Sequence, residues 1–181
     1  MPQTVAHFLF AALLVALFRD YYLKRKDRKT FPLHYVLLAG IGGVLPDIDL
    51  AFYFLLKPLG FAIGEVHRTI THSLTFALFF LIIGFVFHHT NVRALTRHKL
   101  KLSIICFVLA FGICSHLFLD AAVSGENIKI FYPFSDWTVW NGFLQYFSVE
   151  ARSLFAPVLD GVLLLIWVIY LEVKHKISDF V

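Results

Sequence analysis

Long apolar runs alternate with short polar segments along the chain. Five runs are long enough to cross the roughly 30 Å hydrocarbon core of a bilayer as helices, and they cover residues 4–23, 34–56, 71–89, 102–121 and 154–173. An aromatic-rich segment at about 122–153 separates the last two runs, and no internal repeat or linker divides the chain. The pattern predicts one all-α domain over residues 1–181, a polytopic membrane helix bundle of about five transmembrane spans.

Composition narrows the class of protein. Of the 181 residues, 59% are apolar and 15% are charged, whereas soluble domains average about 25% charged residues. An ordinary cytosolic enzyme, a disordered tail and a secreted disulfide scaffold are therefore excluded. The first apolar run has no basic region before it, and Arg19 and Asp20 follow it instead of a small-residue cleavage site. We therefore expect a retained helix rather than a signal peptide.

Positive charges predict the orientation in the membrane. Cytoplasmic loops collect Lys and Arg, and with the N-terminus outside and the C-terminus inside, all but four of the 16 Lys and Arg residues lie on the inner side. The exceptions are Lys57, Arg68, Lys129 and Arg152. The aromatic loop then lies outside, as an interfacial belt or as a lid over a site. Anionic lipid accounts for the basic inner side, so the expected partner is the bilayer of the inner (cytoplasmic) membrane, and no nucleic acid is expected.

Ionisable residues gather at the outer ends of the first four spans. They comprise four histidines and three aspartates, namely His7, Asp47, Asp49, His67, His72, His116 and Asp120. Ionisable side chains inside a membrane are costly and mark functional sites. The other histidines lie on the basic inner side, where solvated or headgroup-facing roles are expected. Four helices therefore bring possible ligands to one depth of one leaflet.

The spacing of two pairs bears on metal binding. His116 and Asp120, in SHLFLD, are four residues apart, so a helix places them on one face, where they can hold the same ion. Asp47 and Asp49, in LPDID, share one side of an extended segment but lie about 200° apart on a helix. One of them can then be a ligand while the other orients an imidazole.

The string HRTITHS contains two further histidines. His67 and His72 are five residues apart, which is about 140° around a regular helix. They can share an ion only if the helix begins between them, with Thr69 or Thr71 as its N-cap.

Two other charged residues have alternative roles. Arg68 lies beside the histidines, and its planar guanidinium suits bidentate binding of a phosphate. It can equally anchor to lipid phosphates or pair with Glu65. Asp160 lies in the last span and is expected to face the bundle interior, either as a partner that orients a ligand or as the partner of Arg152.

The residue types at these positions suit a divalent metal. Neutral imidazoles and carboxylates bind zinc, and also manganese or iron, and the set suffices for one or two ions. A two-metal site would lower the pKa of water and clamp both the attacking and the leaving oxygen of a phosphoryl transfer. The chain has no GxSxG, P-loop, HExxH or CxxC motif, so serine hydrolase, nucleoside triphosphatase, zincin protease and thiol redox chemistry lack support.

An ordered series of motifs completes the pattern: the histidine at position 7, then LPDID, HRTITHS, SHLFLD, SG at 124–125 and YPFS at 132–135. This combination resembles the LexA-regulated, membrane-bound metal-dependent hydrolase family. The resemblance implies a small multi-helix inner-membrane protein with a His/Asp metal centre and hydrolase activity. The HxxxD pair is more distantly similar to the zinc-dependent phospholipase C and P1 nuclease group, which implies phosphodiester chemistry. The chain lacks the further downstream His and Glu ligands expected of those trizinc enzymes.

We therefore expect a membrane-embedded metal-dependent hydrolase, a phosphoesterase that acts on a lipid or lipid-linked substrate at the outer face. Asp49 would orient a ligand or accept a proton from water at the metal, and Arg68 would bind phosphate. The expected metal ligands are His7, Asp47, His67, His72, His116 and Asp120. One alternative is metal transport or sensing, which predicts polar residues continuing inward, whereas the third and fourth spans, in SLTFALFFLIIGFVF and SIICFVLAFGIC, have no carboxylate or histidine below the cluster. Another is a structural helix bundle whose metal ion only links the helices to one another.

Overall fold

The computed structural model describes residues 4–23, 30–90, 92–123, 128–139 and 142–175. It confirms the all-α prediction. The long elements are α1 (Thr4–Leu17) with a π-helical turn at Phe18–Tyr22, α3 (His34–Val44), a 3-10 turn (Leu45–Asp47), α4 (Ile48–Leu56), a 3-10 turn (Lys57–Leu59), α6 (Leu74–Val86), α8 (Leu102–Val123) and α9 (Val149–His175). The short elements are α5 (Ile63–Val66), α7 (Arg93–Arg97), a 3-10 turn (Phe143–Tyr146) and the antiparallel strands β1 (Ile128–Lys129) and β2 (Thr138–Val139).

Four helical segments are long and apolar enough to cross a membrane: Thr4–Tyr22, His34–Leu59, Leu102–Val123 and Val149–Lys174. The span expected at 71–89 is shorter than predicted, because α6 has only 13 residues, about 20 Å at 1.5 Å per residue. Its start is fixed by the hairpin, since the Leu74 N–H donates to the Ile130 carbonyl. The segment before Leu74 stays outside the helix.

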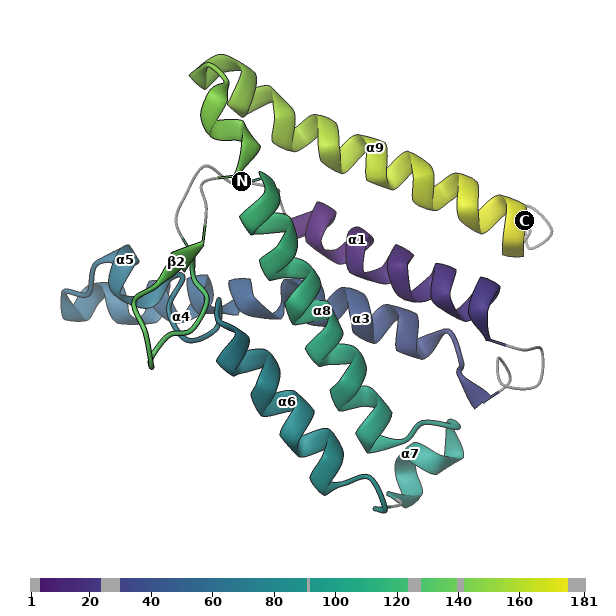
Figure 1. The fold of residues 1–181 in the computed structure, drawn as a ribbon. Helices are drawn as coiled ribbons and strands as arrows, with labels where there is room; N and C mark the ends of the chain where they lie inside the picture. Colours follow the sequence, from purple (N-terminus) through teal and green to yellow (C-terminus); the bar gives the residue numbers. More distant parts are fainter. Residues whose placement is uncertain (1–3, 24–29, 91, 124–127, 140–141, 176–181) are drawn as a thin grey trace.

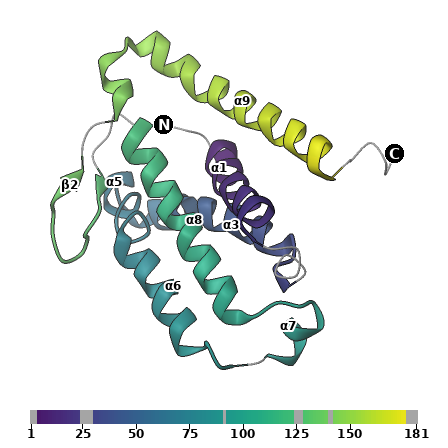
Figure 2. The ribbon, with the colours of Figure 1, turned by 45° about the vertical axis from the view of Figure 1, so that its right-hand side comes forward.

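The helices form a bundle around α8, which packs against α3 and α6. Helix α1 lies between α3 and α9, and α9 runs along the outside of α1 (Figures 1 and 2). The beginning of α1, the end of α3 and the end of α8 meet at one end of the bundle, where the ring of His7 stacks on that of His116 and the His7 carbonyl lies against Gly43. The ionisable residues of the first four predicted spans lie at this end.

Glycines allow α1, α3 and α8 to approach closely. A β-carbon on Gly112 of α8 would overlap the Ala39 carbonyl of α3, and one on Gly43 would overlap the His7 carbonyl of α1. Small residues at such contacts let helix backbones approach in membrane proteins. The helices α1 and α8, which carry His7 and His116, and α3, which the turn with Asp47 follows, are therefore held at short range.

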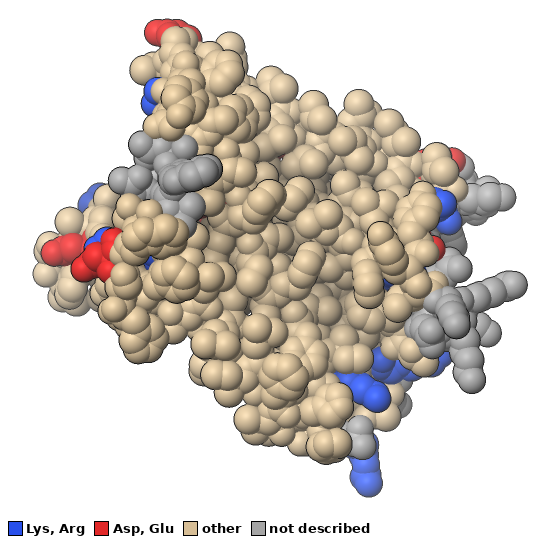
Figure 3. Space-filling model, in the orientation of Figure 1, with Lys and Arg blue, Asp and Glu red and all other residues tan. Residues whose placement is uncertain are grey.

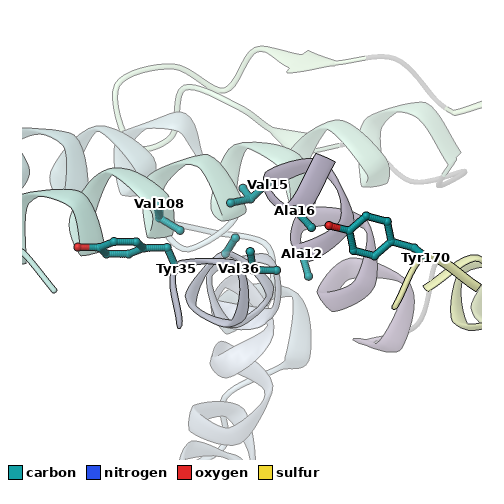
Figure 4. Close-up of a cluster of buried hydrophobic side chains, with 8 residues drawn as sticks. Ala12, Val15, Ala16, Tyr35, Val36, Val108 and Tyr170 are labelled. Atoms are coloured by element: carbon teal, nitrogen blue, oxygen red, sulfur yellow. The ribbon is translucent and has the colours of Figure 1, made fainter. Parts of the chain in front are cut away.

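A cluster of small and aromatic side chains fills the other half of the bundle (Figure 4). Tyr35 is fully buried and its hydroxyl accepts the Lys101 N–H at 2.7 Å. The Tyr170 hydroxyl of α9 donates to Asp20 at 2.6 Å, and Arg19 donates to the same carboxylate at 2.7 Å. These bonds fix the end of α1 that lies away from the ionisable cluster.

Charged residues lie at the two ends of the face shown in Figure 3. Most of the visible Lys and Arg atoms lie towards the end that carries α7 and most of the visible Asp and Glu atoms lie towards α5 and the start of α9, although both signs occur at both ends, and an uncharged belt lies between them. This is the distribution expected of a bundle with its middle in hydrocarbon. The basic segment 24–29 lies outside the described residues.

The loop expected at about 122–153 is shorter and more structured than predicted. Helix α8 continues to Val123, α9 begins at Val149, and the β1–β2 hairpin lies between them. The Thr75 hydroxyl of α6 donates to the Tyr132 carbonyl at 2.8 Å, which ties the hairpin to α6. Phe134 is 84% exposed, as an interfacial side chain would be. Ser124, Gly125 and Trp140 lie outside the described residues.

Candidate metal centre

Four parts of the chain bring the predicted site residues together. Helix α1 supplies His7, the 3-10 turn and the first turn of α4 supply the two aspartates of LPDID, the segment 67–73 supplies two histidines, and α8 supplies His116 and Asp120. His72, His116 and Asp120 are fully buried, and His7 is 2% exposed. The side chains of Asp47 and His67 are 18% and 13% exposed, so they lie on the accessible side of the cluster.

Imidazole nitrogens and carboxylate oxygens face one another at the centre. His7 Nε2 lies 3.4 Å and His116 Nε2 3.5 Å from oxygens of Asp120. One oxygen of Asp47 lies 3.4 Å from His72 Nε2 and 3.8 Å from His116 Nε2. The rings of His7 and His116 stack with their centroids 3.8 Å apart. The structure thus brings these five predicted ligands together, and the sixth, His67, lies in a group with Asp47 and His72.

These distances fit a metal ion better than direct hydrogen bonds. Within the described part of the chain, His72 Nε2, His116 Nε2 and both oxygens of Asp120 are buried without a hydrogen-bond partner. Leaving such groups unsatisfied costs about 1–3 kcal/mol each. A tetrahedral ion with bonds of about 2.0–2.2 Å separates its ligand atoms by roughly 3.4 Å. The residues therefore fit a divalent cation.

More than one position for an ion is available. In three groups, one nitrogen or carboxylate oxygen of each residue lies within 4.8 Å of the others. These groups are His7 with Asp47 and His116, Asp47 with His67 and His72, and His72 with His116 and Asp120. Asp47, His72 and His116 each belong to two of these groups, so the groups found among the described residues overlap.

Asp49 holds the HRTITHS segment in place through hydrogen bonds. Its carboxylate accepts hydrogen bonds from His67 Nδ1 at 2.8 Å, from His72 Nδ1 at 3.1 Å and from the Thr71 hydroxyl at 2.7 Å. It also accepts the Arg68 backbone N–H at 3.1 Å. Because Nδ1 of each histidine is used in this way, Nε2 is left as the ligand nitrogen. Burial lowers the pKa of His72, but its hydrogen bonds to the carboxylates of Asp47 and Asp49 outweigh burial and raise it.

Two local interpretations of the sequence are wrong. No helix begins between His67 and His72: α5 ends before His67 and α6 begins after Ser73. Thr71 is not an N-cap, because its hydroxyl bonds to Asp49, and Thr69 bonds to the Val66 carbonyl. The non-helical segment lets both rings turn towards the same side.

The pair in LPDID also differs from the extended alternative. Asp47 ends a 3-10 turn and Asp49 lies in the first turn of α4, so both have helical backbone. Both aspartates contact His72, whose ring lies between them: Nε2 is directed towards Asp47 and Nδ1 towards Asp49. Asp49 lies in none of the ligand groups, and its contacts are those of a residue that orients histidines.

Arg68 has a left-handed backbone conformation, with φ of 64°. Non-glycine residues rarely adopt this region, and strained residues of this kind occur at functional sites. The hydrogen bond from its N–H to Asp49 holds it there. Glu65, the alternative partner of Arg68, accepts the Ala62 N–H at 2.8 Å and caps α5.

Asp160 reaches the site region from α9. Its carboxylate accepts the backbone N–H of Ala6 at 2.9 Å, in the first turn of α1 and next to His7. Arg152, its expected partner, instead donates to the carbonyls of Phe147 and Gln145. No local pattern predicts this contact, because 154 positions separate the two residues.

The Gly43 carbonyl was also missed by sequence reasoning. It accepts a hydrogen bond from His116 Nδ1 at 2.8 Å, which leaves His116 Nε2 facing the carboxylates. The string GIGG at 40–43 is the available signal, because clustered glycines indicate close helix contacts in membranes.

Comparison with known proteins places the chain in a family. Residues 1–176 match the family model described as YdjM inner membrane protein. No curated protein and no solved structure matches the chain. The family match carries no statement about hydrolysis or about phospholipase C and P1 nuclease. It spans nearly the whole chain and agrees with the apolar helices, so this multi-pass inner-membrane protein belongs to the YdjM family.

Proposed function

We propose that the protein is a metal-dependent hydrolase that cleaves phosphoester bonds of a membrane lipid or lipid-linked substrate. The observation that carries the proposal is the cluster of imidazole nitrogens and carboxylate oxygens that face one another at 3.4–3.8 Å. Among the described residues, His72 Nε2, His116 Nε2 and both oxygens of Asp120 are buried there without a hydrogen-bond partner. Zinc suits this mixture of imidazole and carboxylate, as do manganese and iron.

The ligands divide into two overlapping sets. His7, Asp47 and His116 would hold one ion, and Asp47, His67 and His72 would hold a second. Asp120 would contribute together with His72 and His116, with which it forms the third group. A bound divalent ion supplies Lewis-acid stabilisation of a phosphoryl oxygen and makes water more acidic.

Other residues would bind and orient. Asp49 fixes the Nδ1 atoms of His67 and His72, so that their Nε2 atoms stay directed at the ions. Arg68, in the same segment, would bind the phosphate through its guanidinium. Asp47 and His67 are partly exposed, so the substrate would arrive from their side.

The depth of the site favours a lipid substrate. The ligands lie at the ends of apolar membrane helices, where the headgroup of a lipid is already located. With the N-terminus outside, this is the outer leaflet. Metal transport is less well supported, because α6 and the part of α8 before His116 contain no His, Asp or Glu that would continue an ion path.

The test is metal content measured together with hydrolysis. Protein purified in detergent, together with its His116→Ala and Asp120→Asn variants, is analysed for bound zinc, manganese and iron. Each is also assayed with phosphatidylglycerol as substrate. His34→Ala is the matched control, because His34 is exposed at the start of α3. We expect about one to two ions per chain, with metal and hydrolysis lost in the two site variants and kept in the control.

Three results would contradict the proposal. Absence of bound metal after reconstitution would remove the metal centre. Bound metal with no hydrolysis of phosphatidylglycerol or other lipid phosphoesters would favour a structural metal. Uptake of metal into proteoliposomes, abolished in His116→Ala, would favour transport.

A further inference from the structure

A groove leads from the side of the bundle to the ionisable cluster. It has a volume of about 410 Å³ and lies between α1 and the α3–α4 segment. Thr4 and Phe8 form one wall, and Ile41, Val44 and Ile48 are on the other. Pockets of about 300–1,000 Å³ hold small-molecule ligands, so the groove is large enough for part of one.

The position of the groove determines what can fill it. Both walls belong to segments long and apolar enough to span the membrane. Ile41 is 49% and Ile48 is 46% exposed, so the groove opens sideways into the hydrocarbon. The only molecules at that depth are lipid chains, and apolar walls offer them favourable contacts.

The groove is continuous with the candidate metal centre. Asp47 is the one charged residue in its wall. The same carboxylate lies 3.4 Å from His72 Nε2 and 3.8 Å from His116 Nε2. An apolar channel that ends at a carboxylate of a cation site matches a molecule with a hydrocarbon chain and an anionic head.

We propose that this groove binds an acyl chain of a bilayer phospholipid and thereby places its phosphate at Asp47 and the cluster. The inference rests on the proposed function for the fate of the phosphate, but the binding of the chain can be tested without hydrolysis. It identifies the substrate class as a phospholipid that enters laterally from the membrane.

The test uses a phosphatidylglycerol with a diazirine in its acyl chain, mixed into vesicles that contain the protein. After illumination, labelled peptides are identified by mass spectrometry. Val44→Trp fills the groove, and Ile48→Trp does so at a half-exposed position that tolerates a large side chain. Leu78→Trp is the matched control, because Leu78 is 52% exposed on α6, away from the groove.

We expect saturable labelling of peptides that contain Phe8 and Ile41 in the wild type. The labelling is lost in Val44→Trp and Ile48→Trp and kept in Leu78→Trp, while all three variants retain their bound metal. If the wild type hydrolyses the lipid, we expect kcat/KM for hydrolysis to fall about tenfold in Val44→Trp and Ile48→Trp. The reason is that binding of the acyl chain, remote from the phosphate, contributes to the rate.

The outcomes separate this inference from the proposed function. Groove labelling that is unaffected by either groove variant overturns the inference, even if the lipid is hydrolysed. Groove labelling that both variants abolish supports it, even if no hydrolysis is detected and the proposed enzyme activity fails.

Discussion

Gly112 of α8 lies against the Ala39 carbonyl of α3, so closely that a β-carbon on the glycine would overlap that oxygen. One helical turn further along each helix, His116 donates its Nδ1–H to the Gly43 carbonyl. The close helix contact therefore sets the distance at which the hydrogen bond can form. It also fixes the tautomer of His116, because a carbonyl only accepts.

A larger residue at position 112 should both destabilise the helix bundle and weaken metal binding at the candidate centre. We expect Gly112→Val to lower the free energy of unfolding by about 1–3 kcal/mol through overpacking, and to weaken metal binding because α8 shifts. Unfolding in mixed micelles and metal content measure the two effects. Gly161→Val on α9 is the control, since a β-carbon there meets nothing within 4 Å. Equal stability losses in both variants would contradict the close contact.

Asp49→Asn should weaken metal binding without removing a ligand. Asparagine has only one accepting oxygen, so it can keep either the hydrogen bond from His67 Nδ1 or those from His72 Nδ1 and Thr71, and one histidine loses its orientation. Loss of such a partner costs about 10–100-fold in metal affinity. Competition with a chromogenic chelator measures the affinity. Asp136→Asn is the control, because Asp136 pairs with Lys129 at the exposed hairpin. An unchanged metal affinity in Asp49→Asn would contradict the role of Asp49 in orienting the histidines.

Asp160→Ala tests the link between α9 and α1. The N–H of Ala6 loses a charged acceptor, and hydrogen bonds to charged groups contribute about 1.5–3 kcal/mol. We expect lower thermal stability and weaker metal binding, because His7 follows Ala6 directly. Glu150→Ala, at the exposed start of α9, should change neither. If Asp160→Ala were as stable as the wild type and kept its full metal affinity, the hydrogen bond from Ala6 to Asp160 would not be what positions His7.

Metal removal should lower the stability of the wild type. A ligand that binds only the folded state adds about 2.7 kcal/mol when its free concentration is about 100 times Kd. We expect a chelator to lower the melting temperature in detergent and added zinc to restore it. His116→Ala should show neither shift. Identical shifts in that variant would place metal binding elsewhere.

The orientation can be tested by labelling introduced cysteines from outside intact cells. Phe134→Cys, in the exposed hairpin, should react with a membrane-impermeant maleimide, whereas His89→Cys, after α6, should react only after lysis. Both changes are made in a chain whose Cys106 and Cys114 are replaced by Ala. The reverse pattern would place the centre on the cytoplasmic side.

The membrane helices could be predicted because each one is a long apolar run, and the cluster because its residues sit at the ends of those runs. The conformation of residues 67–73 could not be predicted, because the side chains of His67 and Thr71 bond to Asp49 and the segment does not form a helix of its own. For the same reason α6 begins later than the apolar run. The partner of Asp160 lies far away in sequence, so only packing of α9 on α1 reveals it. The metal and catalytic roles stay predictions.

Helix α9 holds α1 at both ends, through Asp160 on Ala6 and Tyr170 on Asp20. During synthesis α1 leaves the ribosome first and α9 last, so α1 can pack on α3 early, whereas these two contacts form only after α9 has been made. Every proposed ligand has already been made by residue 120. The two contacts that α9 makes with the α1 segment are therefore the last ones to join this part of the bundle as the chain is completed.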